Sequence, residues 1–124
     1  MAPLRIVVLA VDPANFDLSE DVVRQRISDY LSLTPAECDR IYAAYVAQYP
    51  DDKPGDLLGR LTTDHIYIRN TFHTALMQAD AGFAPVYTYV INYETAEMDG
   101  LLRSSHGRDY HFVFDSTDRA VNRY

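Results

Sequence analysis

Cysteine is almost absent from this sequence. Cys38 is the only one, so no disulfide can form within the chain. Its acidic neighbours disfavour a reactive thiolate, and we expect a structural role for it. No apolar run approaches the roughly 20 residues that span a bilayer, and no segment has the pattern of a secretory signal. We therefore expect a soluble, cytoplasmic protein without a membrane partner.

Basic residues are also few. Eleven Lys and Arg stand against 18 Asp and Glu, which gives a formal net charge of −7. The basic residues are scattered, whereas binding to a phosphate backbone needs them clustered, so we expect no nucleic-acid partner. The histidines do not follow the spacings of zinc sites: His65 and His73 lie eight residues apart, and His106 and His111 only flank Asp109. We predict neither a metal nor a cofactor.

The 124 residues, of which 48% are hydrophobic, suffice for a single domain with a real core, residues 1–124. Two short runs are rich in β-branched and aromatic residues, residues 4–11 and residues 86–93. Pro3 and the pair Asp12-Pro13 bound the first run. Short continuous apolar runs of this kind predict strands buried in a parallel sheet that helices cover.

Three helices are predicted between these strands. Ser19 is a suitable N-cap for a helix that stops near Ser32. Thr34-Pro35-Ala36-Glu37 starts the second helix, with a capping residue, proline at the first helical position and an acid at the third.

The third helix is the longest. After a short helical turn at residues 57–61, Thr63 is predicted to cap a helix from about Asp64 to Ala81, which Gly82 closes. Helical spacing predicts that one apolar stripe of this helix is buried, namely Ile68, Phe72, Ala75, Leu76 and Ala79.

A histidine loop follows the second predicted strand. His106-Gly107 stands there, with Asp109 two positions after the glycine and then Phe112-Val113-Phe114. Loops that a rigid strand carries are frequent positions for catalytic groups. An ordinary histidine on a surface loop is the alternative interpretation.

This segment resembles the histidine segment of the type-B carboxylesterase family, a branch of the α/β-hydrolases. Residues 85–93 are similar to the family's last core strand before that histidine, and Thr63-Asp64-His65-Ile66-Tyr67 resembles the opening of one of its long helices. The resemblance covers about residues 60–114. It implies an α/β fold, specifically a C-terminal fragment of an α/β-hydrolase fold with two main strands at about residues 4–11 and 86–93, and it implies that His106 is the catalytic base.

The resemblance also suggests Asp12 as the acid of a Ser-His-acid triad. Asp12 follows the first predicted strand and Phe16 stands four residues on, as in the family. However, Pro13 replaces the family's glycine after the acid. A turn-forming Asp-Pro pair is the alternative interpretation.

The nucleophile is missing from these residues. No Gly-x-Ser-x-Gly occurs, and in α/β-hydrolases the serine precedes the acid and the histidine along the chain. Ser104 and Ser105 adjoin His106, but neighbouring loop side chains diverge and no oxyanion hole is evident. The chain therefore resembles the part of a hydrolase domain that lacks its nucleophile half.

Three functions remain open, of which a small hydrolase that has recruited another nucleophile is the least supported. The first is the C-terminal segment of a carboxylic ester hydrolase that supplies His106, together with Asp12 in the triad interpretation, and acts on a small ester once a nucleophile-bearing segment completes it. The second is a non-catalytic oligomerising or binding module derived from such a hydrolase. Strand edges and helix faces that a larger sheet would cover are exposed in so short a chain. We therefore expect a homo-oligomer, or a packing that differs from that of the parent fold.

Overall fold

The computed structural model describes residues 13–94, 96–100, 103–104 and 109–116, and helices are the only regular elements that these residues form. The chain divides into two compact units, Met1–Tyr87 and Thr88–Tyr124. The prediction of a single domain stays a prediction, because a compact unit is not in itself an independently folding domain.

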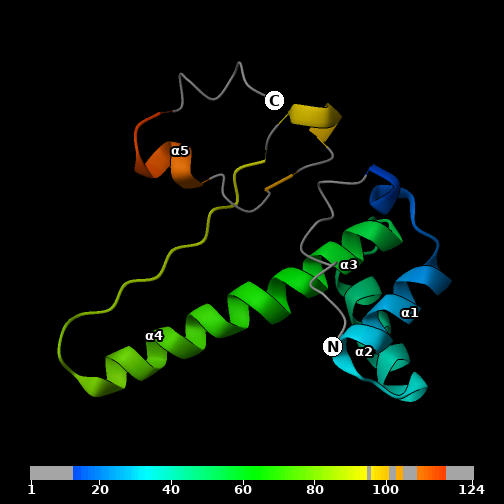
Figure 1. Cartoon of the computed structure of the whole chain (residues 1–124), viewed down its shortest axis with the longest axis horizontal. Helices are drawn as coiled ribbons and strands as arrows, with labels where there is room; N and C mark the ends of the chain where they lie inside the picture. The colour runs from blue at the N-terminus through cyan, green and yellow to red at the C-terminus, as the bar shows by residue number, and fades with distance from the viewer. Residues whose placement is uncertain (1–12, 95, 101–102, 105–108, 117–124) are drawn as a thin grey trace. The chain divides into compact units, whose positions relative to one another are not determined.

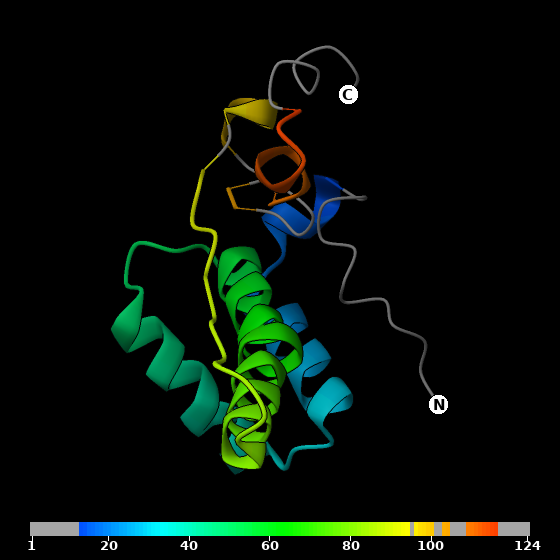
Figure 2. The same cartoon turned by 90° about the vertical axis from the view of Figure 1, so that its left-hand side faces the viewer.

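Three helices of the first unit enclose its core: α1 (Glu20–Leu31), α2 (Pro35–Gln48) and α3 (Pro54–Thr63). Figures 1 and 2 show them gathered together, with the short 3-10 helix η1 (Pro13–Asp17) beside them. Each helix contributes buried side chains to one cluster, which consists of Val23, Ile27, Cys38, Tyr42, Leu57, Leu58 and Leu61. This apolar burial is the main stabilising contribution within the unit.

The start of α2 confirms the predicted capping box. The Glu37 backbone N–H donates to the Thr34 hydroxyl at 3.4 Å, and the Thr34 backbone N–H donates to the Glu37 carboxylate at 2.9 Å. Pro35 occupies the first turn, where a missing N–H costs nothing. The first predicted helix is confirmed as well, because α1 has Ser19 at its N-cap and Ser32 at its C-cap.

The third predicted helix is part of a longer rod. α3 continues through one π-helical turn, η2 (Asp64–Ile68), into α4 (Arg69–Ala81). The predicted cap at Thr63 is wrong: this residue has helical backbone angles, and its hydroxyl donates to the Gly59 carbonyl at 2.9 Å. The predicted end is confirmed, since Gly82 adopts the left-handed conformation with φ +70°.

The rod is longer than the helices that pack on it. Its segments of 10, 5 and 13 residues span about 40 Å, whereas the 12 residues of α1 and the 14 of α2 span only about 20 Å each. α1 and α2 pack on the α3 end, and Figure 1 shows α4 running beyond them. The predicted burial of the apolar stripe is therefore wrong: neither η2 nor α4 contains a buried residue.

The predicted α/β-hydrolase fragment is also wrong for the described residues, which form no sheet. Residues 86–93 were predicted to be a strand, but they form neither helix nor strand, and Tyr87 is 88% exposed. Their composition favours an extended backbone, yet a strand also needs a neighbour to complete its hydrogen bonds, and no described segment pairs with it. The other predicted strand, residues 4–11, lies outside the described residues.

The second unit has two short helices among its described residues, η3 (Glu97–Gly100) and α5 (Asp109–Val113). The rings of Tyr93 and Phe112 meet edge to face with their centroids 5.4 Å apart. This contact links the start of the unit to α5.

Candidate interaction surface

The two predicted catalytic residues, His106 and Asp12, lie outside the described residues. Of the two serines beside the histidine, Ser105 lies outside as well. The Ser104 hydroxyl donates to the Ile91 carbonyl at 2.9 Å, a contact that holds two segments of the second unit together. Nothing in the described geometry brings a catalytic triad together.

The other histidines have separate surroundings. The His65 ring meets the Tyr30 ring edge to face, with centroids 5.7 Å apart, and Nδ1 of His111 lies 3.4 Å from the Ser116 hydroxyl. His73 is exposed on α4. Within the described ranges no three His, Cys, Asp or Glu side chains are grouped so that they could hold a metal ion.

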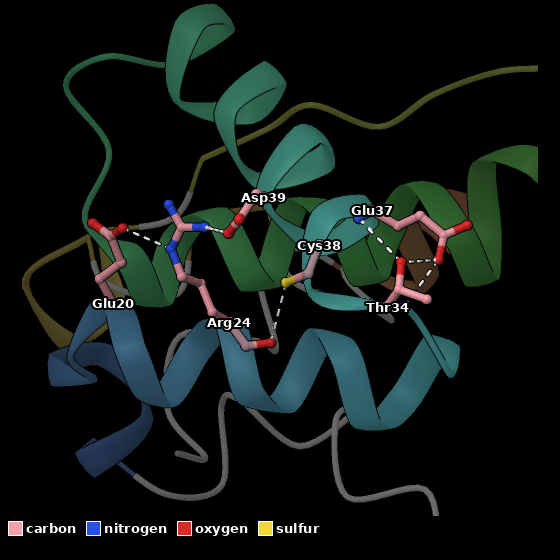
Figure 3. A network of polar contacts seen from close by, with 6 residues as sticks. All are labelled: Glu20, Arg24, Thr34, Glu37, Cys38 and Asp39. Atoms are coloured by element: carbon pink, nitrogen blue, oxygen red, sulfur yellow. Dashed lines mark hydrogen bonds and ion pairs between the residues drawn. The ribbon is translucent and has the colours of Figure 1, made fainter.

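A cluster of polar side chains belongs to the contact between α1 and α2. Arg24 donates from Nε to Glu20 at 2.7 Å and from a terminal nitrogen to Asp39 at 2.6 Å (Figure 3). Its guanidinium also lies 4.3 Å from the centre of the Tyr42 ring. The hydrogen bond to Glu20 is the main reason why the pKa of Arg24 rises above its ordinary value. These contacts give Arg24 a structural role in the packing of α1 against α2.

Cys38 has a structural role of the same kind. Its thiol is buried in the core cluster and donates to the Arg24 carbonyl at 3.3 Å (Figure 3). A buried thiol with an internal acceptor is a packing group.

A second polar contact marks the π-helical turn. The Tyr45 hydroxyl of α2 donates to the Asp64 carboxylate at 2.7 Å. The pKa of Tyr45 is raised well above its usual range. Burial is the main cause, and this hydrogen bond is the second. Single π-helical turns often lie at functional positions, but here this contact and the ring contact between His65 and Tyr30 hold the turn against α2 and α1. The uncovered part of the rod is α4, which begins at Arg69.

The exposed face of α4 is the candidate surface. Phe72 is 45% exposed and Leu76 is 63% exposed, although both are large apolar side chains. Four residues apart on a helix, they are neighbours on one face. Charged residues bracket them on that face: Arg69 lies three residues before Phe72, and Asp80 lies four residues after Leu76. We call Arg69, Phe72, Leu76 and Asp80 the α4 stripe.

The two charges of the α4 stripe cannot neutralise each other within the helix. Arg69 and Asp80 are eleven residues apart, about three turns, so they point to the same side but stand about 16 Å apart along the axis. Both are exposed. The stripe thus has a positive end, an apolar middle and a negative end.

Comparisons with known proteins do not assign this chain. No protein-family model matches the sequence, and no solved structure matches it significantly. None of the helices in the described ranges is both long and apolar enough to cross a membrane.

The sequence contained a signal for this surface. Helical spacing identifies the apolar stripe, and Arg69 and Asp80 lie on the same line along the helix. Two charges on the line of a supposedly buried stripe are unfavourable unless the helix end that carries them is solvated. The length of the predicted helix relative to the two before it was the second signal.

Proposed function

We propose that this protein is a non-catalytic oligomerising module, in which α4 of one copy packs against α4 of a second copy. One observation carries the proposal: α4 buries none of its residues, while Phe72 and Leu76 stand side by side in solvent. Neighbouring large apolar groups on one helix face are typical of a helix that packs against another helix. The opposite charges at the two ends of the stripe make a second copy a suitable partner.

Association removes these side chains from water. Fully burying an exposed Phe or Leu side chain contributes roughly 1.5–3 kcal/mol. Because Phe72 is 45% exposed and Leu76 is 63% exposed, each gains only about half of this on association, and the gain occurs in both copies of a symmetric pair. Against this stand the lost translational and rotational freedom and the ordering of side chains. With a helix of only 13 residues the interface is small, so we expect a dissociation constant on the order of micromolar.

The direct test places a charge in the α4 stripe. Leu76→Glu is expected to abolish association, because an unpaired carboxylate would have to be desolvated in the interface. The matched control, Gln78→Glu, introduces the same group about half a turn away, on the opposite face of the helix. Sedimentation velocity at protein concentrations from about 1 to 100 µM, chosen to span the expected dissociation constant, compares the variants with the unmodified chain.

The expected result is a dimer for the unmodified chain and for Gln78→Glu, and a monomer for Leu76→Glu. Circular dichroism checks that the helical content is unchanged. Dimers that survive Leu76→Glu would contradict the proposal, as would equal dissociation of both variants.

The alternative function as an ester hydrolase segment stays a prediction. It depends on the resemblance around His106 and on Asp12, and on a nucleophile-bearing segment that would act on a small carboxylic ester with them. No described contact favours it over the oligomerising module.

A further inference from the structure

We infer that the two α4 helices pair antiparallel about a two-fold axis, so that Arg69 of each copy lies beside Asp80 of the other. This inference rests on the proposed function and specifies its geometry. It names the residues that select the partner and its orientation, beyond the apolar contact itself.

The order of groups along the α4 stripe carries the inference. Read along the helix, the stripe runs from a cation through two apolar groups to an anion: Arg69, Phe72, Leu76, Asp80. A parallel pair would place Arg69 next to Arg69 and Asp80 next to Asp80, which is repulsive at both ends. An antiparallel pair instead sets a cation against an anion at both ends.

Two-fold symmetry makes this arrangement self-complementary. In an isologous interface the contacts are reciprocal: if residue i of one copy contacts residue j of the partner, then residue j of the first copy contacts residue i of the partner. When the helices are centred midway between Phe72 and Leu76, Phe72 of one copy lies opposite Leu76 of the other, and the reverse contact follows. Both apolar contacts and both ion pairs therefore come from one register.

Spacing and size support the same register. Arg69, Phe72, Leu76 and Ala79 follow one another at intervals of three, four and three residues, the pattern with which helices pack side by side. In the stated register Arg69 lies opposite Ala79, whose small side chain leaves room for the apolar stem of the arginine. The guanidinium then reaches the carboxylate of Asp80, the next residue.

The ion pairs lie at the rim of the interface. Rim pairs are solvated and contribute modestly to affinity, but they discriminate strongly between orientations, because the wrong one brings like charges together. Their effect is therefore best measured by charge reversal, which replaces an attraction by a repulsion at both ends of the dimer at once.

The test is a charge-reversal cycle on the full chain. Arg69→Glu and Asp80→Arg are made singly and together, with Gln78→Glu and Gln78→Arg as controls that change the charge on the opposite face. Sedimentation equilibrium at low ionic strength gives the dissociation constants. Each single reversal is expected to weaken dimerisation roughly tenfold, and added salt is expected to reduce the effect. The double variant is expected to return to within about threefold of the unmodified chain, because the attractive pairs are restored with their signs exchanged.

The outcomes distinguish failure of the antiparallel pairing from failure of the oligomerising module itself. If Leu76→Glu dissociates the dimer but the single reversals bind like the unmodified chain, the inference fails and the oligomerising module stands. If the double variant dimerises as weakly as the single variants, the antiparallel pairing also fails and the oligomerising module stands. If the unmodified chain is a monomer at every concentration, both fail.

Discussion

Thr34 and Glu37 form reciprocal hydrogen bonds at the first turn of α2. The Thr34 hydroxyl donates to the Glu37 carboxylate at 2.6 Å and accepts from the Glu37 backbone N–H at 3.4 Å. The hydrogen bond from the Thr34 side chain is the main reason why the pKa of Glu37 is lowered. A carboxyl group with a lowered pKa in the folded state stabilises the fold above its unfolded pKa, and this contribution is lost as the pH falls through the folded pKa.

We predict that Thr34→Ala lowers the free energy of unfolding by about 1 kcal/mol at neutral pH, since an N-cap hydroxyl is lost. The difference from the unmodified chain should shrink in acid, because protonation of Glu37 already weakens the capping box there. Urea unfolding followed by circular dichroism at neutral and at acidic pH measures both differences.

Thr34→Ser is the control, since it keeps the hydroxyl and should behave like the unmodified chain. A difference for Thr34→Ala that stays the same from neutral to acidic pH would show that Glu37 is not coupled to the cap.

At the scale of elements, Gly55 decides how closely α3 approaches η1. A Cβ atom at this position would lie 2.5 Å from the Asn15 carbonyl oxygen and 3.3 Å from the Phe16 carbonyl. Both neighbours are backbone atoms, which cannot turn aside as a flexible side chain would.

We therefore predict that Gly55→Ala destabilises the fold by about 1–3 kcal/mol, as overpacking does, even though alanine is the better helix former. Hydrogen exchange should show faster exchange in η1 and unchanged protection in the middle of α2. Gly82→Ala is the comparison: nothing lies within 4 Å of a Cβ there, so only the strain at φ +70° remains and η1 should be unaffected. Unchanged stability for Gly55→Ala would contradict the close approach.

The elements that could be predicted from the sequence are those with local causes. α1 and α2 begin directly after Ser19 and Thr34, as the sequence predicts. At α2 the cause is local, because the Thr34 side chain accepts a hydrogen bond from the first turn. The Ser19 side chain makes no such bond, and at α1 only the position of the helix start is confirmed. The prediction at Thr63 was wrong because the sequence does not distinguish a threonine that caps a helix from one inside a helix. The Thr63 hydroxyl donates to the carbonyl four residues back.

The features that could not be predicted have causes distant in the sequence. Residues 86–93 have strand composition, but a strand depends on its partner, which composition does not supply. The exposure of Phe72 and Leu76 depends on the lengths of α1 and α2. Both helices are short, pack against α3 and leave α4 uncovered. The surface proposed here could thus be recognised as apolar from the sequence, but its exposure only from the structure.

At the scale of the whole molecule, an oligomerising module and a hydrolase segment differ in what the purified chain does to an ester. We predict no hydrolysis of a short-chain p-nitrophenyl ester above the buffer rate, because no Gly-x-Ser-x-Gly nucleophile is present. The His106→Ala variant is assayed beside the unmodified chain. Hydrolysis that this substitution abolishes would contradict the non-catalytic proposal.

The central claim is that α4 joins two copies of the chain, and the molar mass of the unmodified protein tests it most directly. Sedimentation equilibrium over a range of concentrations around the micromolar region should show the mass rise from 14.1 kDa toward twice that value. A mass that stays at 14.1 kDa at every concentration would contradict the claim and leave the apolar face of α4 without a second copy to cover it.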